Sequence, residues 1–228
     1  GSLQASKIGN RSWRIRACDI DDYILSTSNG SKADSSSVGE NAVIMTSPVH
    51  IGEPRLISLF SGCGGMDMGF KKAGFNIVFA NDFDSDAQAV YSLNLGEIDS
   101  RNILTVGEDD IPDGDILTAG FPCQPFSNAG NRKGVHDSRG MLYKECLRII
   151  NKKMPKVIVC ENLKELLSTK YIDGRNLPEV IVEDLTNMNG IGYNVVYKLV
   201  NAADYGVPQN RQRVLFVGVR RDLDVTFK

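Results

Sequence analysis

Apolar and polar positions along the chain follow two different spacings from Arg55 onward. Short apolar runs rich in β-branched residues alternate with stretches whose apolar residues recur at helical intervals. The first spacing is typical of buried strands and the second of helices that cover a sheet. The expected strands are Leu56–Phe60, Ile77–Ala80, Ile116–Ala119, Val157–Cys160, Asn194–Val200 and Val214–Val219.

Two of the intervening stretches predict helices that face the core. Their apolar residues are Leu142, Cys146, Ile149 and Ile150 in one, and Leu177, Ile181, Leu185 and Met188 in the other. Only residues 201–213 separate the last two strands, which is too short for a helical crossover, so we expect an antiparallel pair there. The predicted fold is a doubly wound, mostly parallel α/β sheet with an antiparallel edge hairpin. Ligands bind such sheets beyond the carboxyl ends of the strands.

The N-terminal part of the chain has a different composition. Residues 26–40 are dominated by serine, glycine, asparagine and aspartate, which predicts a flexible linker. We therefore expect an N-terminal extension and linker over residues 1–50 and one main domain over residues 51–228. A chain of 228 residues with 42% hydrophobic content is long enough to build one sizeable core.

Charge and cysteine content indicate the cellular environment of the protein more than its function. The formal net charge is −2, so the whole chain lacks the basic field typical of many nucleic-acid-binding proteins, although local arginine groups are compatible with such binding. The five cysteines lack the close spacings of a zinc site or a disulfide framework, which predicts a reducing, intracellular setting and no metal. The sequence has no long apolar run and no signal pattern, so we expect neither membrane insertion nor export.

A glycine-rich segment, Phe60-Ser61-Gly62-Cys63-Gly64-Gly65, directly follows the first predicted strand and precedes a helix-compatible stretch. Glycines permit a tight turn and a close approach of the backbone to a ligand at a helix N-terminus. Asp82 ends the second strand, where nucleotide-binding sheets place the carboxylate that holds ribose hydroxyls. The pattern favours a cofactor site; a purely structural turn and a helix-capping Asp82 are the alternatives.

Three further features point to chemistry at the same edge of the sheet. Two prolines bracket Cys123 and Gln124 after the third strand, which stiffens the loop and favours a reactive cysteine over a buried one. Glu161 follows the fourth strand, so we expect it to converge with Cys123; capping of the next helix is its alternative role. Arg211 and Arg213 point the same way if extended, and offer planar donors to an anionic or carbonyl acceptor or to surface acids.

The set FSGCGG, GFPCQPFS, ENL and QNRQRV, in this order and at these strand ends, resembles the DNA cytosine carbon-5 methyltransferases over about residues 55–222. The resemblance implies a Rossmann-like S-adenosylmethionine-dependent methyltransferase fold and methylation of a cytosine flipped out of duplex DNA. Carbon 5 of cytosine is a poor nucleophile, so Cys123 would activate it by adding to carbon 6. Glu161 would act at ring nitrogen 3, and Arg213, with Arg211 beside it, at the ring carbonyl.

The resemblance also implies a cofactor site for S-adenosylmethionine, with S-adenosylhomocysteine as the product. Asp82 would hold the ribose and Phe83 would stack on the adenine. Asn102 stands where the family usually has an acid, and its amide oxygen is still an acceptor. The residues implied are Phe60, Ser61, Gly62, Cys63, Gly64, Gly65, Asp82, Phe83, Asn102, Ile103, Gly120 and Pro122.

The family normally continues past the QNRQRV segment into a target-recognition domain, which is absent from this sequence. A truncated chain, a split enzyme whose second polypeptide supplies recognition, and a circular permutation are the competing explanations. Residues 7–10 and 20–25 resemble the family's final Gly-Asn helix placed before the first motif, which predicts a cofactor-side helix over residues 7–25.

Two other functions remain open on the sequence. A tRNA cytosine methyltransferase has the same core motifs and differs by acting on RNA. A catalytically silent regulatory homologue would bind a partner without chemistry, but the presence of Cys123 and Glu161 argues against it. The compact domain favours a bacterial restriction-modification system, and hence a cytoplasmic location, over a eukaryotic nuclear protein.

Overall fold

The computed structural model describes residues 6–8, 12–14, 53–122, 140–171 and 173–223. The chain divides into two compact units, Gly1–Val49 and His50–Lys228. In the first unit, β1 (Ser6–Ile8) pairs antiparallel with β2 (Ser12–Arg14). Strands therefore occupy part of the stretch where we expected a helix over residues 7–25. The remainder of that stretch and the linker over residues 26–40 lie outside the described residues.

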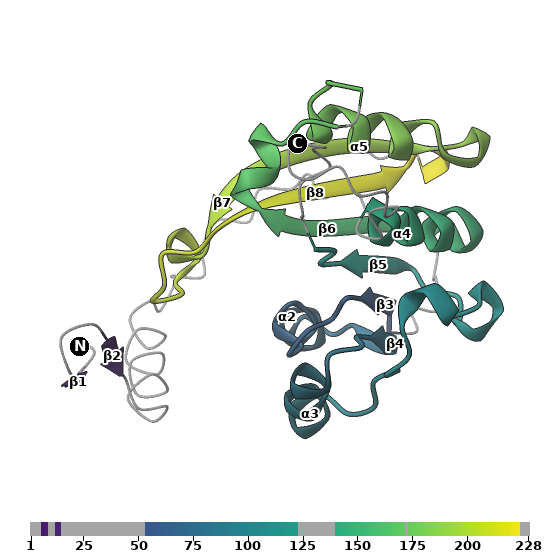
Figure 1. The fold of residues 1–228 in the computed structure, drawn as a ribbon. Coiled ribbons are helices and arrows are strands. Elements are labelled where there is room, and N and C mark those ends of the chain that lie inside the picture. Colours follow the sequence, from purple (N-terminus) through teal and green to yellow (C-terminus); the bar gives the residue numbers. More distant parts are fainter. Residues whose placement is uncertain (1–5, 9–11, 15–52, 123–139, 172, 224–228) are drawn as a thin grey trace, which may run out of the picture. The chain divides into compact units, whose positions relative to one another are not determined.

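The second unit contains a six-stranded sheet with the order β4-β3-β5-β6-β8-β7 (Figure 1). Its strands are β3 (Arg55–Leu59), β4 (Asn76–Asn81), β5 (Ile116–Ala119), β6 (Val157–Leu163), β7 (Tyr193–Asn201) and β8 (Gln212–Arg220). Its α-helices are α2 (Gly65–Lys72), α3 (Ser85–Asn94), α4 (Gly140–Lys153) and α5 (Leu177–Thr186). Short 3-10 helices are η1 (Ile103–Thr105), η2 (Glu108–Asp110), η3 (Lys164–Ser168), η4 (Met188–Gly190), η5 (Ala202–Tyr205) and η6 (Arg221–Leu223).

The sheet confirms the predicted topology. Strands β4, β3, β5 and β6 are parallel, whereas β8 is antiparallel to both β6 and β7. Each of the six expected strands is present, within three residues at either end.

One strand boundary differs from the prediction in a way that affects the site. β6 continues past Cys160, so Glu161 lies inside the strand and not after it. The reason is the change of partner: β5 ends at Ala119, opposite Cys160, whereas β8 keeps pairing until Arg213 lies opposite Leu163. Glu161 is therefore held by an antiparallel ladder, which fixes its backbone more firmly than a loop would.

The core contains the apolar stripes that the sequence predicted for α4 and α5. Ile149 and Ile181 are fully buried in one cluster with Ile57, Leu117 and Ile158, which the strand register places side by side. Neighbouring strand residues point to the opposite face of the sheet. There the Ser58 hydroxyl reaches α2, so helices pack on both faces as a doubly wound sheet requires.

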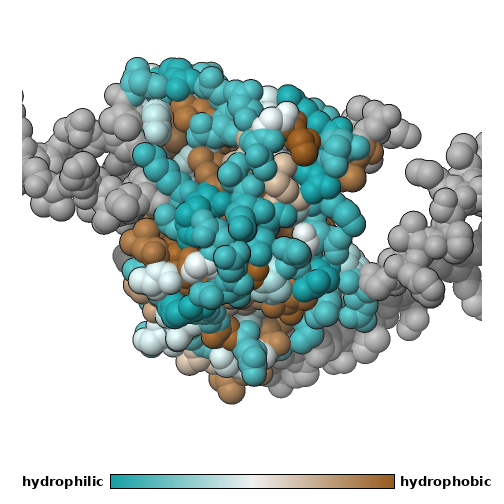
Figure 2. All heavy atoms as spheres, turned by 90° about the vertical axis from the view of Figure 1, so that its right-hand side faces the viewer, coloured by the Kyte–Doolittle hydropathy of each residue, from teal (hydrophilic) through white to brown (hydrophobic). Residues whose placement is uncertain are grey.

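The surface that faces the right of Figure 1 is mostly hydrophilic, with hydrophobic side chains in small separate patches (Figure 2). Ion pairs such as Lys156–Asp115 and Arg220–Asp222 lie where β6 begins and β8 ends. Within the described ranges, no helix has the length and apolar character needed to cross a membrane. The same ranges hold no cluster of three or more His, Cys, Asp or Glu side chains arranged to bind a metal ion.

Candidate active site

The carboxyl ends of the four parallel strands lie at one edge of the sheet. Leu59 pairs with Asn81 on one side and Ala119 on the other, and Ala119 pairs with Cys160. Segments that continue from these residues therefore emerge next to one another. The predicted site residues at this edge are Phe60, Asp82, Gly120 and Glu161.

The glycine turn after β3 has a conformation that few residues adopt. Phe60 has a φ of 53°, in the left-handed region, and Gly62 and Gly64 also have positive φ. A non-glycine residue in this region costs on the order of 1 kcal/mol or more, so its surroundings must hold it there. Two hydrogen bonds do so: Ser61 N–H donates to the Asn81 carbonyl (3.0 Å), and Gly64 N–H donates to the Ser61 carbonyl (2.9 Å).

Asp82 connects the end of β4 to this turn. Its Oδ2 accepts a hydrogen bond from Gly62 N–H (2.8 Å), and its Oδ1 accepts one from Asp84 N–H (3.0 Å). Asp84, not Asp82, is the N-cap of α3, because its side chain accepts from Ala87 N–H. Phe83 is 65% exposed beside this carboxylate. Asp84 thus caps the helix, which was the alternative role for Asp82, and Asp82 instead stabilises the glycine turn.

Asn102 and Ile103 follow a segment that is tied to the same strand. The Asn81 amide donates to the carbonyl groups of Asp99 and Arg101 at 3.0 and 2.8 Å. Asn102 is exposed, and its amide oxygen caps η1 by accepting from the backbone N–H of Leu104. The Ile103 side chain, in contrast, is buried in the core, so it is not on the open side of the site.

The segment Gly120–Pro122 leads from β5 toward Cys123, which itself lies outside the described residues. Gly120 N–H donates to the Leu59 carbonyl (3.2 Å), and a Cβ at Gly120 would approach the Phe60 carbonyl to 3.3 Å. The buried Asn162 amide donates to the Phe121 carbonyl (2.9 Å). Backbone contacts from β3 and a side chain from β6 thus fix the path of the chain up to Pro122.

Glu161 and both predicted arginines meet across β6 and β8. Arg213 Nε lies 2.9 Å from Glu161 Oε1, and a terminal nitrogen of Arg211 lies 3.7 Å from the same oxygen. Glu161 and Arg213 are about one-quarter exposed, whereas Arg211 is about half exposed. An open pocket of about 510 Å³ adjoins them. It is lined by Leu163, Lys164, Glu165, Gln209, Asn210, Arg211, Gln212 and Arg213.

Two of the described cysteines are unsuited to nucleophilic chemistry. Burial raises the pKa of the Cys160 thiol to about 12, and burial also raises the pKa of the Cys146 thiol. A thiol with a raised pKa remains protonated at neutral pH and is a weak nucleophile. Cys63 is exposed on the glycine turn.

Sequence reasoning did not single out a set of buried polar residues behind the site. The Asp67 carboxylate accepts hydrogen bonds from the Ser58 and Tyr91 hydroxyls, and Asn162 makes the contact to Phe121 described above. An acid in the first turn of a helix normally faces solvent, so its position gave no signal. Asn162 is the one residue of this set with a signal in the sequence: it follows Glu161, and strand alternation places its side chain on the buried side.

These features define a doubly wound α/β sheet with a glycine turn, an acidic residue after the second strand and an acid–arginine pair at the same edge, as in S-adenosylmethionine-dependent methyltransferases. The family model for C-5 cytosine-specific DNA methylase matches residues 54–228. The chain belongs to this family.

Two curated relatives show how far the similarity extends. The chain is 43% identical over 171 residues to the Type II methyltransferase M.HhaI of Haemophilus parahaemolyticus, covering 75% of this chain and 50% of the relative. It is 44% identical over 179 residues to the Type II methyltransferase M.NgoFVII of Neisseria gonorrhoeae, covering 77% and 46%. The chain thus spans about half the length of the curated relatives it matches.

Solved structures support the same assignment of the fold. The structure of S. pombe Dnmt2 methyltransferase superimposes with a TM-score of 0.63 at 25% identity, covering 77% of this chain and 53% of that one. The Spodoptera frugiperda DNMT2 mutant structure gives a TM-score of 0.62 at 26% identity, with the same coverage of each chain.

Proposed function

We propose that this protein takes part in methyl transfer from S-adenosylmethionine to carbon 5 of cytosine in duplex DNA. The observation that carries the proposal is the Glu161–Arg213 pair at the carboxyl edge of the sheet, in a chain of the cytosine-specific family. The relatives M.HhaI and M.NgoFVII are Type II methyltransferases, which favours a restriction-modification role.

In the proposed reaction, the Cys123 thiolate adds to carbon 6 of the cytosine, and the electrons of the 5,6 double bond become available at carbon 5. Glu161 holds or supplies a proton at ring nitrogen 3, which stabilises the charge that develops on the ring. Carbon 5 would then take the methyl group that S-adenosylmethionine supplies, with S-adenosylhomocysteine as the product. Removal of the carbon-5 proton restores the double bond and expels the Cys123 thiolate, so the enzyme is regenerated.

Arg213 can serve both partners of this step. Its Nε faces Glu161 and one terminal nitrogen donates to the Gln212 carbonyl (2.7 Å), so the other terminal nitrogen can donate to the ring carbonyl of the base. Arg211 lies beside the same carboxylate and adds positive charge. This arrangement would favour negative charge on the ring during addition of the thiolate.

The residues around the glycine turn fit S-adenosylmethionine, which supplies the electrophilic methyl group when bound. No described atom lies within 4 Å of a Cβ built at Gly62 or Gly65, so the turn is open on that side. The exposed Phe83 ring is available for stacking on a purine. Asp82 retains lone pairs for ribose hydroxyls while it holds Gly62.

The proposal extends to the partner and the setting. We propose that the residues that read the DNA sequence lie outside this chain, in the same polypeptide or in a second one, because the relatives are about twice as long. An intracellular location accords with the five cysteines, whose spacing does not match a disulfide framework.

A direct test is methyl transfer from tritium-labelled S-adenosylmethionine to duplex DNA and, in parallel, to tRNA. Label recovered from DNA as 5-methylcytosine is the expected result. Label recovered only from tRNA would replace the proposal with a tRNA cytosine methyltransferase. Absence of label from both, under conditions in which the cofactor binds by calorimetry, would contradict activity in these residues alone.

A further inference from the structure

A buried carboxylate lies directly behind the glycine turn. Asp67, in the first turn of α2, is 1% exposed. Its Oδ1 accepts a hydrogen bond from the Ser58 hydroxyl (2.7 Å), and its Oδ2 accepts one from the Tyr91 hydroxyl (2.8 Å). Burial of a carboxylate costs free energy, and these two donated hydrogen bonds offset part of that cost.

The first hydrogen bond continues into the turn. The Ser61 hydroxyl lies 2.8 Å from the Ser58 hydroxyl, which in turn donates to Asp67. An ionised carboxylate can only accept hydrogen bonds. The Ser58 hydroxyl must therefore donate its hydrogen bond to Asp67, and its oxygen accepts the hydrogen bond from the Ser61 hydroxyl. The carboxylate thereby fixes the direction of the Ser58 hydroxyl, while the Ser61 hydroxyl also lies within reach of the Ser58 and Asn81 carbonyls (3.2 and 3.4 Å). Ser61 follows Phe60, whose left-handed backbone needs such support.

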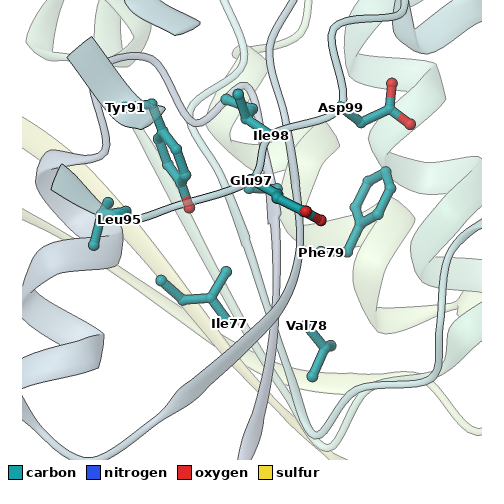
Figure 3. A pocket seen from close by; sticks show the side chains of 9 residues that line it. Ile77, Val78, Phe79, Tyr91, Leu95, Glu97, Ile98 and Asp99 are labelled. Atoms are coloured by element: carbon teal, nitrogen blue, oxygen red, sulfur yellow. The ribbon is translucent and has the colours of Figure 1, made fainter. Parts of the chain in front are cut away.

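The second hydrogen bond reaches the helix that follows Asp82 and Phe83. Tyr91 lies in α3, and its ring packs so closely on the turn that a Cβ at Gly64 would be 2.9 Å from it. With Leu95 and Ile77, Tyr91 lines a cleft of about 380 Å³ between α3 and β4 (Figure 3). The Tyr91 hydroxyl thus ties α3 to the first turn of α2, which follows the glycine turn.

These contacts join the two sides of the candidate cofactor site through one group. On one side is the turn from Phe60 to Gly65; on the other are Asp82 and Phe83, which directly precede the N-cap of α3. We infer that Asp67 is a positioning residue that sets the spacing between the glycine turn and α3, and thereby the affinity for S-adenosylmethionine. The inference rests on the proposed function, since it presumes that this cofactor binds between the two.

The test compares the binding of S-adenosylmethionine to the purified protein, to four single variants and to one double variant by calorimetry. Asp67→Asn keeps the shape of the side chain but replaces one acceptor with a donor, and Tyr91→Phe keeps the ring but removes the hydroxyl. Ser58→Ala breaks the link to Ser61. Tyr193→Phe is the matched control, because it removes a buried hydroxyl that donates to the Pro155 carbonyl (2.9 Å) from β7, at the opposite edge of the sheet from β4.

We expect Kd to rise about tenfold in Asp67→Asn and in Tyr91→Phe, with less than about twofold change in Tyr193→Phe. Since the two hydroxyls act through one carboxylate, the effect of Ser58→Ala combined with Tyr91→Phe should be smaller than the product of the single effects. In steady-state assays, KM for the cofactor should rise while kcat changes less than about twofold, a split that general loss of folded protein would not produce.

Different results separate this inference from the proposed function. If the unmodified protein binds the cofactor and both Asp67→Asn and Tyr91→Phe bind within about twofold of it, the inference is overturned and the proposed function stands. If Asp67→Asn does not fold, Tyr91→Phe decides, because its ring still fills the same space. If the unmodified protein does not bind S-adenosylmethionine, the cofactor part of the proposed function fails, and the inference fails with it.

Discussion

Arg213 Nε lies 2.9 Å from Glu161 Oε1, across the antiparallel pair formed by β6 and β8. In that pair Arg213 is opposite Leu163, and Glu161 is opposite Leu215, so the two side chains are diagonal neighbours on one face of the sheet. Their separation is set by the register of two strands. The acid and the cation are therefore preorganised before any base enters the site.

This pair yields the first prediction. Glu161→Gln keeps the shape but removes the charge, and should lower the single-turnover rate of methyl transfer by about 10² to 10⁴. Arg213→Ala should lower it by about 10² or more. The melting temperature should fall by no more than about 4 °C, because a partly exposed ion pair contributes at most about 1 kcal/mol. Arg220→Ala, at the other end of β8, is the control; an equal loss of rate there would contradict the assignment.

Asn162 gives a prediction about the segment that leads to Cys123. Asn162→Ala leaves the Phe121 carbonyl without its donor in a buried place, which costs about 1–3 kcal/mol of unfolding free energy. Denaturant unfolding measures that loss. We also expect slower methyl transfer, since the path up to Pro122 is no longer fixed. Full activity in a destabilised Asn162→Ala protein would show that this contact serves folding alone.

Gly64 and Gly65 are adjacent, and their substitution by alanine should have different effects. A Cβ at Gly64 would lie 2.3 Å from Leu95 Cδ1 and 2.9 Å from the Tyr91 ring, and φ there is +83°. Gly64→Ala should therefore lower the unfolding free energy by about 1–3 kcal/mol. A Cβ at Gly65 meets no described atom within 4 Å, so Gly65→Ala should be within about 1 kcal/mol of the parent. Thermal unfolding of both proteins checks this, and equal melting temperatures would contradict the packing at Gly64.

Asp67 should make stability depend on pH in a defined direction. Burial raises the pKa of its carboxyl group, although hydrogen bonds from Ser58 and Tyr91 act the other way. A raised pKa means that the folded state holds the proton more strongly, so this group lowers stability as pH rises from its unfolded-state pKa, about 3.9, through its folded-state pKa. Asp67→Asn lacks this effect. Its melting temperature relative to the parent should therefore increase with pH across that window and level off above it; a decrease would mean that the pKa is lowered.

Much of the fold was predictable from hydrophobic spacing, because each strand is a short apolar run that ends at a polar or glycine-rich segment. Since parallel strands end at a common edge, the sequence alone was enough to place Phe60, Asp82, Gly120 and Glu161 near one another. The antiparallel hairpin followed from the length of its connection.

The remaining features depend on contacts between segments that are distant in the sequence. Glu161 lies within β6 because β8 extends beyond β5, and no local pattern encodes the length of a partner strand. Asp84 caps α3, and Asp82 accepts a hydrogen bond from Gly62 N–H. Which of the two acids takes which role depends on the position of the glycine turn. The burial of Asp67 depends on two hydroxyls that come from β3 and α3.

The central claim, covalent catalysis at cytosine by Cys123, is tested most directly by trapping the intermediate. The protein is incubated with S-adenosylmethionine and duplex DNA that carries 5-fluorocytosine, in which fluorine replaces the proton that must leave carbon 5. We predict a protein–DNA adduct that survives denaturation, is lost in Cys123→Ala and persists in Cys146→Ala, which removes a buried thiol of α4 outside the candidate site. An adduct that forms equally well in Cys123→Ala would contradict the account.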